Sequence, residues 1–404
     1  MNSNTPALQL SNRLLAMEES ATLAMQVKAR ELQAQGHKII NLNLGEPDFP
    51  TPQHIQDAAV AAIQDGKYFK YPPVAGYPEL RQGIAEKLLR DNGLSYTPEQ
   101  IVVSTGAKQS IVNILLSILN KGDEVIVFTP YWVSYIEQIK LAEGTPVLLE
   151  GSIENDFKPN AEQLKAAITP NTKMVLFSSP CNPTGSVFTK EELNAIAEVL
   201  KEREDIYVVS DEIYEFINFE GKHNSIAEID YMKERTIIVN GFSKGYAMTG
   251  WRLGYIAAPL AIAKACNKVQ GQVTSGTCTI SQRAGLAAIN GPMEATEEMK
   301  KAYLRRRDLV KGELDKIKGI KTNKPKGAFY IFPDVSAFYG KSFNGKVIKD
   351  SNDLAMYLLN EAHVSIVSGA AFGAPNCIRI SFAAADEDLK KACELITEAL
   401  GRLS

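Results

Sequence analysis

The alternation of short apolar runs with helical patterns between residues 100 and 260 constrains the fold more than any other feature of the sequence. Several of these runs are rich in Val and Ile and apolar throughout, which is typical of strands covered on both faces. Between two of them, Ile111, Ile114 and Ile118 lie on one helical stripe. This alternation predicts an α/β domain with a mainly parallel sheet. We expect strands at 100–104, 125–128, 174–178, 206–210, 236–240 and 253–257.

The two ends of the 404-residue chain differ from this middle part. Residues 301–404 open with a charged helical stretch, continue with short strand candidates at 328–332 and 377–382, and close with a helix. Because no Gly/Ser-rich linker precedes this tail, we expect it to pack on the central domain. We therefore predict a large domain at 51–300 and a smaller α+β domain, formed by 301–404 and joined by the N-terminal segment 1–50. The active site is expected in the cleft between the two domains.

The composition excludes several classes of protein. The formal net charge is −3 and no basic patch stands out, so we expect no nucleic-acid partner. No apolar stretch approaches the roughly 20 residues that span a bilayer, and residues 1–15 lack a signal-peptide pattern, so no membrane partner is expected. Five scattered cysteines without a CxxC pair favour a reducing cytoplasm. Four histidines without metal-ligand spacing predict no metal site.

Five of the expected strands end in residues that suit a phosphorylated aromatic cofactor. Ligands of open α/β sheets bind beyond the carboxyl ends of the strands. Gly106 permits a tight turn into a helix whose first N–H groups can hold a phosphate, although glycine there could also be purely steric. Asp211 closes an apolar strand, which is costly unless it meets a cation, although it could also cap a helix. The other strand ends carry Trp132, Asn182 and Lys244.

Lys244 is the most specific of these residues. A lone lysine is nearly always a solvated surface residue. Lys244 instead follows a buried strand and lies in an aromatic, glycine-rich segment, eight residues before Arg252. This context indicates a functional lysine.

The segment around Lys244 resembles the class I and II aminotransferases of pyridoxal phosphate (PLP) fold type I. The resemblance covers nearly the whole chain and includes residues 45–49 (GEPDF), 71–81 (YPPVAGYPELR) and 379–382 (RISF). The YWVSY, SDEIYE and AMTGWR segments are most similar to the bacterial aspartate-specific subgroup. The motifs occur in the order expected for this family.

The resemblance implies that PLP is the cofactor and gives each matching residue a role. Lys244 matches the lysine that holds PLP as a Schiff base and moves the α-proton of the substrate. Asp211 matches the carboxylate that keeps the pyridine nitrogen protonated, which makes the ring an electron sink. Asn182 and Tyr214 match the donors to the ring hydroxyl, and Trp132 matches the stacking aromatic residue.

For the phosphate, the resemblance implies a site shared between two subunits. Arg252 matches the phosphate-binding arginine, and the turn at Gly106, Ala107 and Lys108 supplies backbone N–H groups. Tyr71 matches a tyrosine that reaches the phosphate from the neighbouring subunit, so a homodimer with shared active sites is implied. Many relatives place Ser or Thr three residues before the lysine, where this chain has glycine at 241, and whether the serine at 243 replaces that contact stays open.

The resemblance also implies that the substrates are an amino acid and a 2-keto acid, exchanged by a ping-pong mechanism. Arg379 matches the arginine that grips the α-carboxylate, and the backbone at Gly45 closes over the same group. In the aspartate-specific subgroup a Ser-Ala-Thr segment and a lysine grip the distal carboxylate. Ser20, Thr22 and Lys108 match them, which predicts transfer from L-aspartate to 2-oxoglutarate.

Other functions remain as alternatives. An aromatic, alanine or prephenate aminotransferase, or a C–S lyase, would share most of these residues and differ in the distal pocket. Relatives that accept prephenate carry a basic residue ahead of the Ser-Ala-Thr segment, where this chain has Glu18 and Glu19, so prephenate is not expected as the main substrate. A non-catalytic regulatory protein of this fold would carry an added winged-helix segment, for which we see no room before residue 20.

Overall fold

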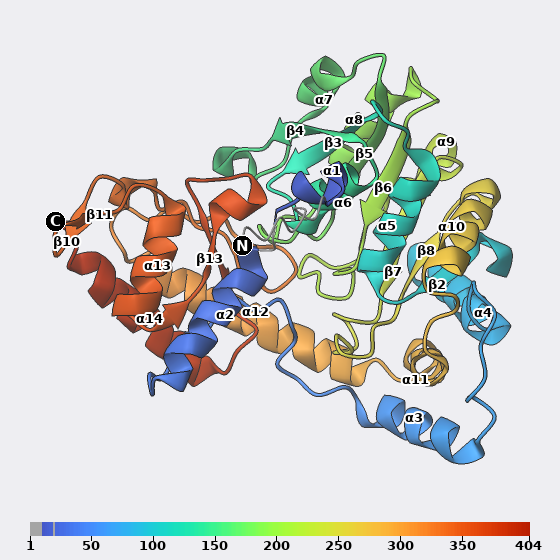
Figure 1. The fold of residues 1–404 in the computed structure, drawn as a ribbon, viewed down its shortest axis with the longest axis horizontal. Helices are drawn as coiled ribbons and strands as arrows, with labels where there is room; N and C mark the ends of the chain where they lie inside the picture. The colour runs from blue at the N-terminus through green and yellow to red at the C-terminus, as the bar shows by residue number, and fades with distance from the viewer. Residues whose placement is uncertain (1–9, 19–20) are drawn as a thin grey trace, which may run out of the picture.

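The computed structural model describes residues 10–18 and 21–404, and its largest sheet has seven strands in the order β2-β8-β7-β6-β5-β3-β4 (Figure 1). All neighbouring strands pair in parallel except β8, which is antiparallel to β2 and to β7. The strands are β2 (Ile101–Ser104), β3 (Glu124–Thr129), β4 (Thr145–Glu150), β5 (Thr172–Ser178), β6 (Tyr207–Asp211), β7 (Thr236–Gly241) and β8 (Gly254–Ala257). The six expected strands and the α/β fold are confirmed, whereas β4 was not expected.

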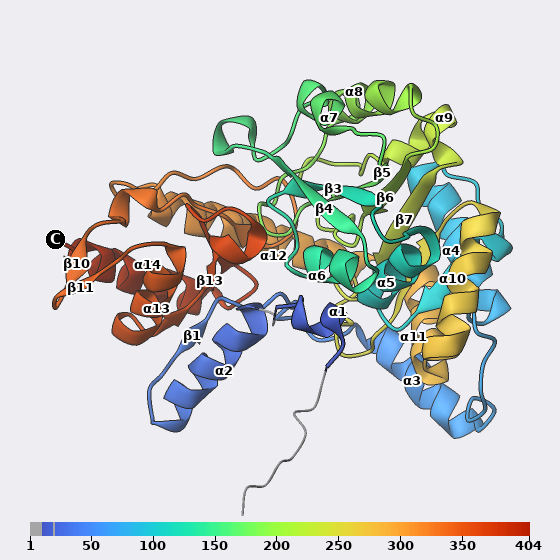
Figure 2. The same cartoon turned by 45° about the horizontal axis from the view of Figure 1, so that its top comes forward.

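Helices cover both faces of this sheet because the side chains of each strand alternate between the faces. Val125 and Val127 of β3 belong to the apolar cluster of α5, whereas Ile126 and Phe128 belong to that of α8. Figure 2 shows α7, α8 and α9 above the sheet and α5 and α6 below it. The helices of the large domain are α3 (Gln53–Asp65), α4 (Pro78–Lys87), α5 (Ala107–Ile118), α6 (Ser134–Leu141), α7 (Ala161–Ala167), α8 (Lys190–Lys201), α9 (Asp230–Lys233), α10 (Leu260–Val273) and α11 (Thr279–Asn290).

The two ends of the chain meet in a second, smaller unit. The N-terminal strand β1 (Ile40–Asn41) pairs in parallel with β12 (Val364–Ser365), and the nearby three-stranded sheet has the order β13-β14-β9. The elements of this unit are α2 (Ala21–Ala34), α12 (Glu294–Leu314), β9 (Tyr330–Ile331), β10 (Ser342–Phe343), β11 (Lys346–Val347), α13 (Ser351–Glu361), β13 (Val367–Ser368), β14 (Ile378–Ser381) and α14 (Asp386–Gly401). The short helix α1 (Asn12–Leu15) lies against α6 of the large domain. The strand candidates and the closing helix expected at this end of the chain are therefore confirmed.

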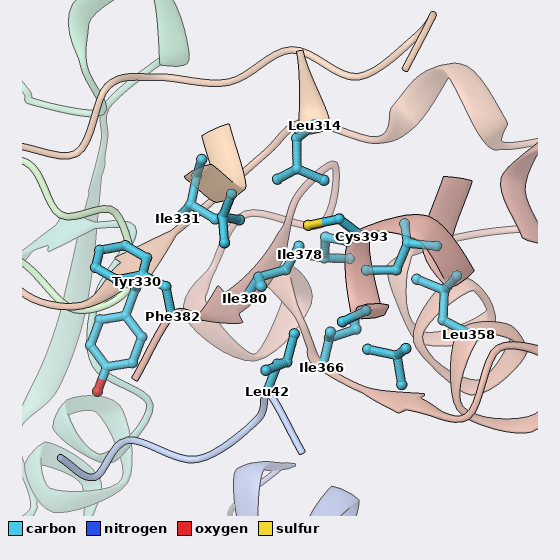
Figure 3. Packing of buried hydrophobic residues seen from close by; sticks show 14 of the residues in the cluster. Leu42, Leu314, Tyr330, Ile331, Leu358, Ile366, Ile378, Ile380, Phe382 and Cys393 are labelled. Carbon is cyan, nitrogen blue, oxygen red and sulfur yellow. The ribbon is translucent and has the colours of Figure 1, made fainter. Parts of the chain in front are cut away.

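The core of the smaller unit combines residues from both ends of the chain. Figure 3 shows Leu42, from the segment after β1, packed beside Ile366 and Ile380. Each of these side chains is at most 1% exposed, so this packing ties the N-terminal segment to the unit. This contact supports the assignment of the N-terminal segment 1–50 to the smaller unit. Helix α12 runs across the expected boundary at residue 300, and the division into 1–50, 51–300 and 301–404 stays a proposal.

The described residues also bear on membrane and metal binding. In the described part of the chain, no helix is long and apolar enough to cross a membrane. Within the same residues, no group of three or more His, Cys, Asp and Glu side chains is placed to hold a metal ion.

Candidate active site

A cavity of about 480 Å³ opens where the carboxyl ends of the large-sheet strands meet the smaller unit. Because β8 runs against its neighbours, the residues that precede it lie at the same edge of the sheet as the ends of β6 and β7. The sheet topology thus brings together residues that are far apart in the sequence. The cavity is lined by most of the predicted site residues, namely Thr22, Gly45, Ala107, Lys108, Trp132, Asn182, Asp211, Tyr214, Lys244, Arg252 and Arg379.

Lys244 extends from the segment after β7 into this cavity. Its Nζ atom donates a hydrogen bond to the carbonyl oxygen of Gly45 and lies 5.7 Å from the centroid of the Tyr214 ring. Burial lowers the pKa of Lys244 to about 8, although the carboxylate of Glu46 acts in the opposite direction. The amine of Lys244 is therefore neutral more often near neutral pH than that of an exposed lysine, and a neutral amine can act as a nucleophile or a base.

Asp211, the last residue of β6, is only 5% exposed. Its Oδ2 atom accepts a hydrogen bond of 2.6 Å from the Tyr135 hydroxyl, and its Oδ1 atom accepts one of 3.2 Å from the backbone N–H of Ile213. Burial raises the pKa of Asp211 to about 6, against the effect of the Tyr135 hydrogen bond. A cation in the cavity would favour the ionised form, so the site is suited to a protonated ring nitrogen.

Arg379, on β14, is 2% exposed and is held by two hydrogen bonds. Nη1 donates to Oδ1 of Asn182 at 3.0 Å, and Nη2 donates to the carbonyl oxygen of Asn43 at 2.6 Å. The first bond also fixes the amide of Asn182, which leaves its Nδ2 group as the donor available to a ligand. The Nε atom of Arg379 is buried and finds no partner in the described part of the chain, so the guanidinium keeps capacity for an anion.

Arg252 lies against the turn that opens α5. A Cβ atom at Gly106 would come within 2.6 Å of Nη2 of Arg252, and Gly106 also has a φ of +84°. Only glycine meets both requirements without strain. Arg252 itself has a φ of +53°, a conformation that costs a non-glycine residue about 1–3 kcal/mol. The backbone is therefore strained where a cation faces the free N–H groups of the first turn of α5.

The backbone at residue 241 leaves no room for a side chain. A Cβ atom at Gly241 would come within 2.9 Å of both Cα of Gly254 and the carbonyl oxygen of Leu253. The close approach of β7 and β8 therefore accounts for the glycine at this position. Ser243 lines the cavity two residues further on.

The outer side of the cavity is formed by α2 and the start of α5. Thr22 and Lys108 both line it, and Nζ of Lys108 lies 5.0 Å from the centroid of the Trp132 ring. A neighbouring hollow of about 700 Å³ shares Lys108 and Arg252 with this cavity and extends toward Glu18 of the N-terminal segment. Cationic side chains therefore stand at the junction of the two hollows.

Among the described residues, the predicted Gly106 and Tyr71 do not line the cavity, and Gly106 lies next to it against Arg252. The side chain of Tyr71 is 95% exposed, so any role in a shared site requires a second subunit. Ser20, with Glu19, falls outside the described residues.

Two tyrosines that the sequence did not single out belong to the site. Tyr135 is 1% exposed and donates to Asp211, and Tyr330 is 0% exposed and lies 2.8 Å from the Tyr214 hydroxyl. Tyr135 is the last residue of the YWVSY segment, three positions after Trp132. The motif that pointed to Trp132 therefore also contained Tyr135. Tyr330 is 116 positions from Tyr214, and only the folded chain brings the two together.

The donor set fits PLP. The cavity offers an amine for its aldehyde at Lys244, a buried carboxylate for its ring nitrogen at Asp211 and a neutral phenol at Tyr214, whose pKa burial raises well above its usual value. The turn at Gly106 and the guanidinium of Arg252 offer N–H donors for its phosphate.

A family model for the class I and II aminotransferases matches residues 37–396. An aspartate/prephenate aminotransferase from Cereibacter sphaeroides is 46% identical over 98% of this chain and 99% of that protein. An aspartate aminotransferase from Bacillus subtilis is also 46% identical, over 96% of this chain and 98% of that protein.

Solved structures give the same picture. The crystal structure of an aspartate aminotransferase from Rhizobium meliloti superposes with a TM-score of 0.95 at 42% identity, covering 98% of this chain and 100% of that one. The aspartate aminotransferase from Thermus thermophilus, solved with maleate, has a TM-score of 0.91 at 44% identity and covers 97% of this chain and 100% of that one.

Proposed function

The chain belongs to the class I and II aminotransferase family, whose cofactor is PLP, and we propose that it transfers the amino group of L-aspartate to 2-oxoglutarate. The observation that carries this proposal is the convergence of Lys244, Asp211 and Arg379 on one cavity. The names of the relatives and the dicarboxylate maleate in the Thermus structure support aspartate as the amino donor.

Bound PLP supplies an electron sink, which takes up the electron pair that remains when the substrate loses its α-proton. In our proposal Asp211 keeps the ring nitrogen protonated. Burial, which raises the pKa of this carboxylate, favours a cationic partner beside it. Asn182 and Tyr214 donate to the ring oxygen, and Trp132 stacks on the ring.

The phosphate would be held by Arg252 and by the backbone N–H groups of Ala107 and Lys108, with Ser243 as a candidate in place of the contact missing at Gly241. Tyr71 would reach the phosphate of a neighbouring subunit, so we propose a homodimer with shared sites. Its 95% exposure in the single chain supports this role.

Lys244 would act as the proton carrier once the substrate has taken its place on the cofactor. Its Nζ atom then moves the proton from the substrate Cα, and a positioned base of this kind contributes about 10²–10⁴-fold. Arg379 grips the α-carboxylate with the donors that Asn182 and Asn43 leave unused. The substrate is thereby held with its Cα–H bond near the amine. Water would release the first keto acid and leave its amino group on the enzyme. A second keto acid would take up that amino group by the reverse steps, as a ping-pong mechanism requires.

The distal carboxylate of aspartate would meet Lys108 and Thr22, with Ser20 as a further candidate outside the described residues. Each hydrogen bond to a charged group is worth about 1.5–3 kcal/mol, so two of them select a dicarboxylate strongly over alanine. We also propose a cytoplasmic location, which the five free cysteines support.

The test is to load the purified protein with PLP and measure glutamate formed from 2-oxoglutarate with aspartate, alanine or tyrosine as the amino donor. Prephenate is a keto acid, so it is tested separately as the amino acceptor in place of 2-oxoglutarate, with aspartate as the donor. We expect aspartate to give the highest kcat/KM. With aspartate as the donor, a higher kcat/KM for prephenate than for 2-oxoglutarate would overturn the choice of amino acceptor. The name of the Cereibacter protein makes prephenate the second candidate. Release of ammonia and pyruvate from cysteine conjugates without amino transfer would overturn the reaction class.

A further inference from the structure

We propose that Tyr330 is a positioning residue of this site, whose ring supports the guanidinium of Arg379 and whose hydroxyl donates to Tyr214, so that Tyr214 can donate to the ring oxygen of the cofactor. This inference rests on the function proposed above. It links the residue that binds the substrate carboxylate to the residue that tunes the cofactor.

The register of the small sheet places Tyr330 next to Arg379. In the antiparallel pair of β9 and β14, Tyr330 is opposite Ser381. Arg379 lies two residues before Ser381 and therefore on the same face of the sheet, where diagonal neighbours are within reach of long side chains. Figure 3 shows the Tyr330 hydroxyl pointing away from the apolar cluster around Ile331 and Ile380.

The Tyr330 ring covers one face of the guanidinium. The Cζ atom of Arg379 lies 4.5 Å from the centroid of this ring, and both residues are at most 2% exposed. Because water is excluded, such a cation–π contact is stronger than one at an exposed site. The ring supports the face of the guanidinium, while Asn182 and Asn43 hold its edge. The plane of the guanidinium is thereby fixed before a carboxylate arrives.

The Tyr330 hydroxyl completes the hydrogen bonding of Tyr214. Their oxygens are 2.8 Å apart, both are buried, and either can be the donor. A hydroxyl has one proton to donate, so if Tyr214 gives its proton to the cofactor, its contact with Tyr330 is a hydrogen bond only if Tyr330 donates. Tyr330 is placed to be that donor. Hydrogen bonds in such a chain strengthen each other, which makes Tyr214 a better donor than it would be alone.

The space for the Tyr330 hydroxyl is provided by Gly45. A Cβ atom at Gly45 would come within 2.8 Å of this hydroxyl, so a side chain there would displace it. The carbonyl oxygen of Gly45 also accepts the hydrogen bond from Lys244. Tyr330 therefore lies next to three residues of the site, namely Gly45, Tyr214 and Arg379.

The test compares two variants that separate the hydroxyl from the ring. Tyr330→Phe removes only the hydroxyl, and Tyr330→Leu removes the ring as well. The readouts are the pH midpoint of the visible absorption band of the PLP-loaded protein and the Kd for maleate, a dicarboxylate that does not react. Circular dichroism and the presence of the band check that each variant folds and binds the cofactor.

For Tyr330→Phe we expect the pH midpoint to rise by about 0.3–1 unit, the size of one neutral hydrogen bond. The pH midpoint should rise because Tyr214 becomes a weaker hydrogen-bond donor and leaves more negative charge on the ring oxygen of the cofactor. This charge holds more tightly the proton whose loss changes the band. The Kd for maleate should change by less than about twofold, since the ring remains under Arg379. For Tyr330→Leu we expect the Kd for maleate to rise by about 10-fold or more.

The matched control is Tyr357→Phe. Tyr357 is buried in α13 and donates a 2.7 Å hydrogen bond to the carbonyl oxygen of Ala399, away from the cavity, so its loss should leave both readouts unchanged. A Tyr330→Phe midpoint equal to the wild-type value would refute the role of the hydroxyl, and a Tyr330→Leu Kd equal to the wild-type value would refute the role of the ring. A wild type that develops no visible band would instead refute the proposed function itself.

Discussion

The inner and outer sides of the cavity are built differently. The inner side consists of residues at the ends of buried strands or paired with them, and Asp211, Asn182 and Arg379 are each at most 7% exposed. The outer side consists of Lys108, which is exposed at the start of α5, and Thr22 on α2, where the neighbouring Leu23 is 61% exposed.

This difference separates the residues that act on the cofactor from the residues that select the substrate. Groups that act on the cofactor must keep a precise geometry, and the seven-stranded sheet supplies it because its strands are packed on both faces. Groups that select the distal end of the substrate lie on less buried elements, where a substitution changes few packing contacts. We therefore expect changes on the inner side to remove activity and changes on the outer side to redirect it.

The largest effect should come from Arg379→Lys on the inner side. A lysine ammonium cannot reproduce the planar fork that bonds Asn182, Asn43 and a carboxylate together, so kcat/KM for aspartate should fall by about 100-fold or more. Steady-state kinetics measure this change. Arg305→Lys is the matched control, because Arg305 pairs with Asp386 at the surface, and its kcat/KM should stay within about twofold. A loss of less than threefold in Arg379→Lys would remove the contrast between the two sides.

A smaller and selective effect is expected from Lys108→Met on the outer side. Losing one charged hydrogen bond to the distal carboxylate should lower kcat/KM for aspartate by about 10–100-fold and leave alanine nearly unchanged. Lys140→Met, which removes a nearby lysine that pairs with Glu137, is the control. An equal loss for both amino acids would mean that Lys108 serves the cofactor and not substrate choice.

The smallest effect concerns the pH dependence of cofactor loading on the inner side. Only the neutral amine of Lys244 can attack the aldehyde of PLP, and burial lowers the pKa of this lysine to about 8 from 10.5. The rate at which cofactor-free protein takes up PLP should therefore rise with pH and reach half its maximum near pH 8. Stopped-flow absorbance measures this rate. Glu46→Gln removes a charge that raises the pKa, so its midpoint should lie lower, whereas a wild-type midpoint near pH 10 would contradict an enclosed lysine.

The sequence predicted the inner side better than the outer side. Six strands of the large sheet were found because their apolar runs are continuous. The residues after five of them, β2, β3, β5, β6 and β7, lie in one cavity. Strand β4 was not predicted from the sequence. It is an edge strand in which only Leu149 is buried, and a proline occupies its second position. Its pattern therefore does not differ from that of a loop.

Contacts between distant parts of the chain account for what the sequence could not predict. The contact of Tyr330 with Tyr214 depends on how the smaller unit sits against the sheet, and no local pattern encodes that. Ser20 and Tyr71 stay predictions, since the first lies outside the described residues and the second awaits a partner subunit.

The central claim is that Lys244 holds the cofactor, and locating the attachment tests it most directly. The protein loaded with PLP is reduced with borohydride, digested and examined by mass spectrometry. We predict that the cofactor mass is found on the peptide that contains Lys244, and that the Lys244→Ala variant carries none and shows no visible band. Attachment at another lysine, or amino transfer by a protein without any attachment, would contradict the account.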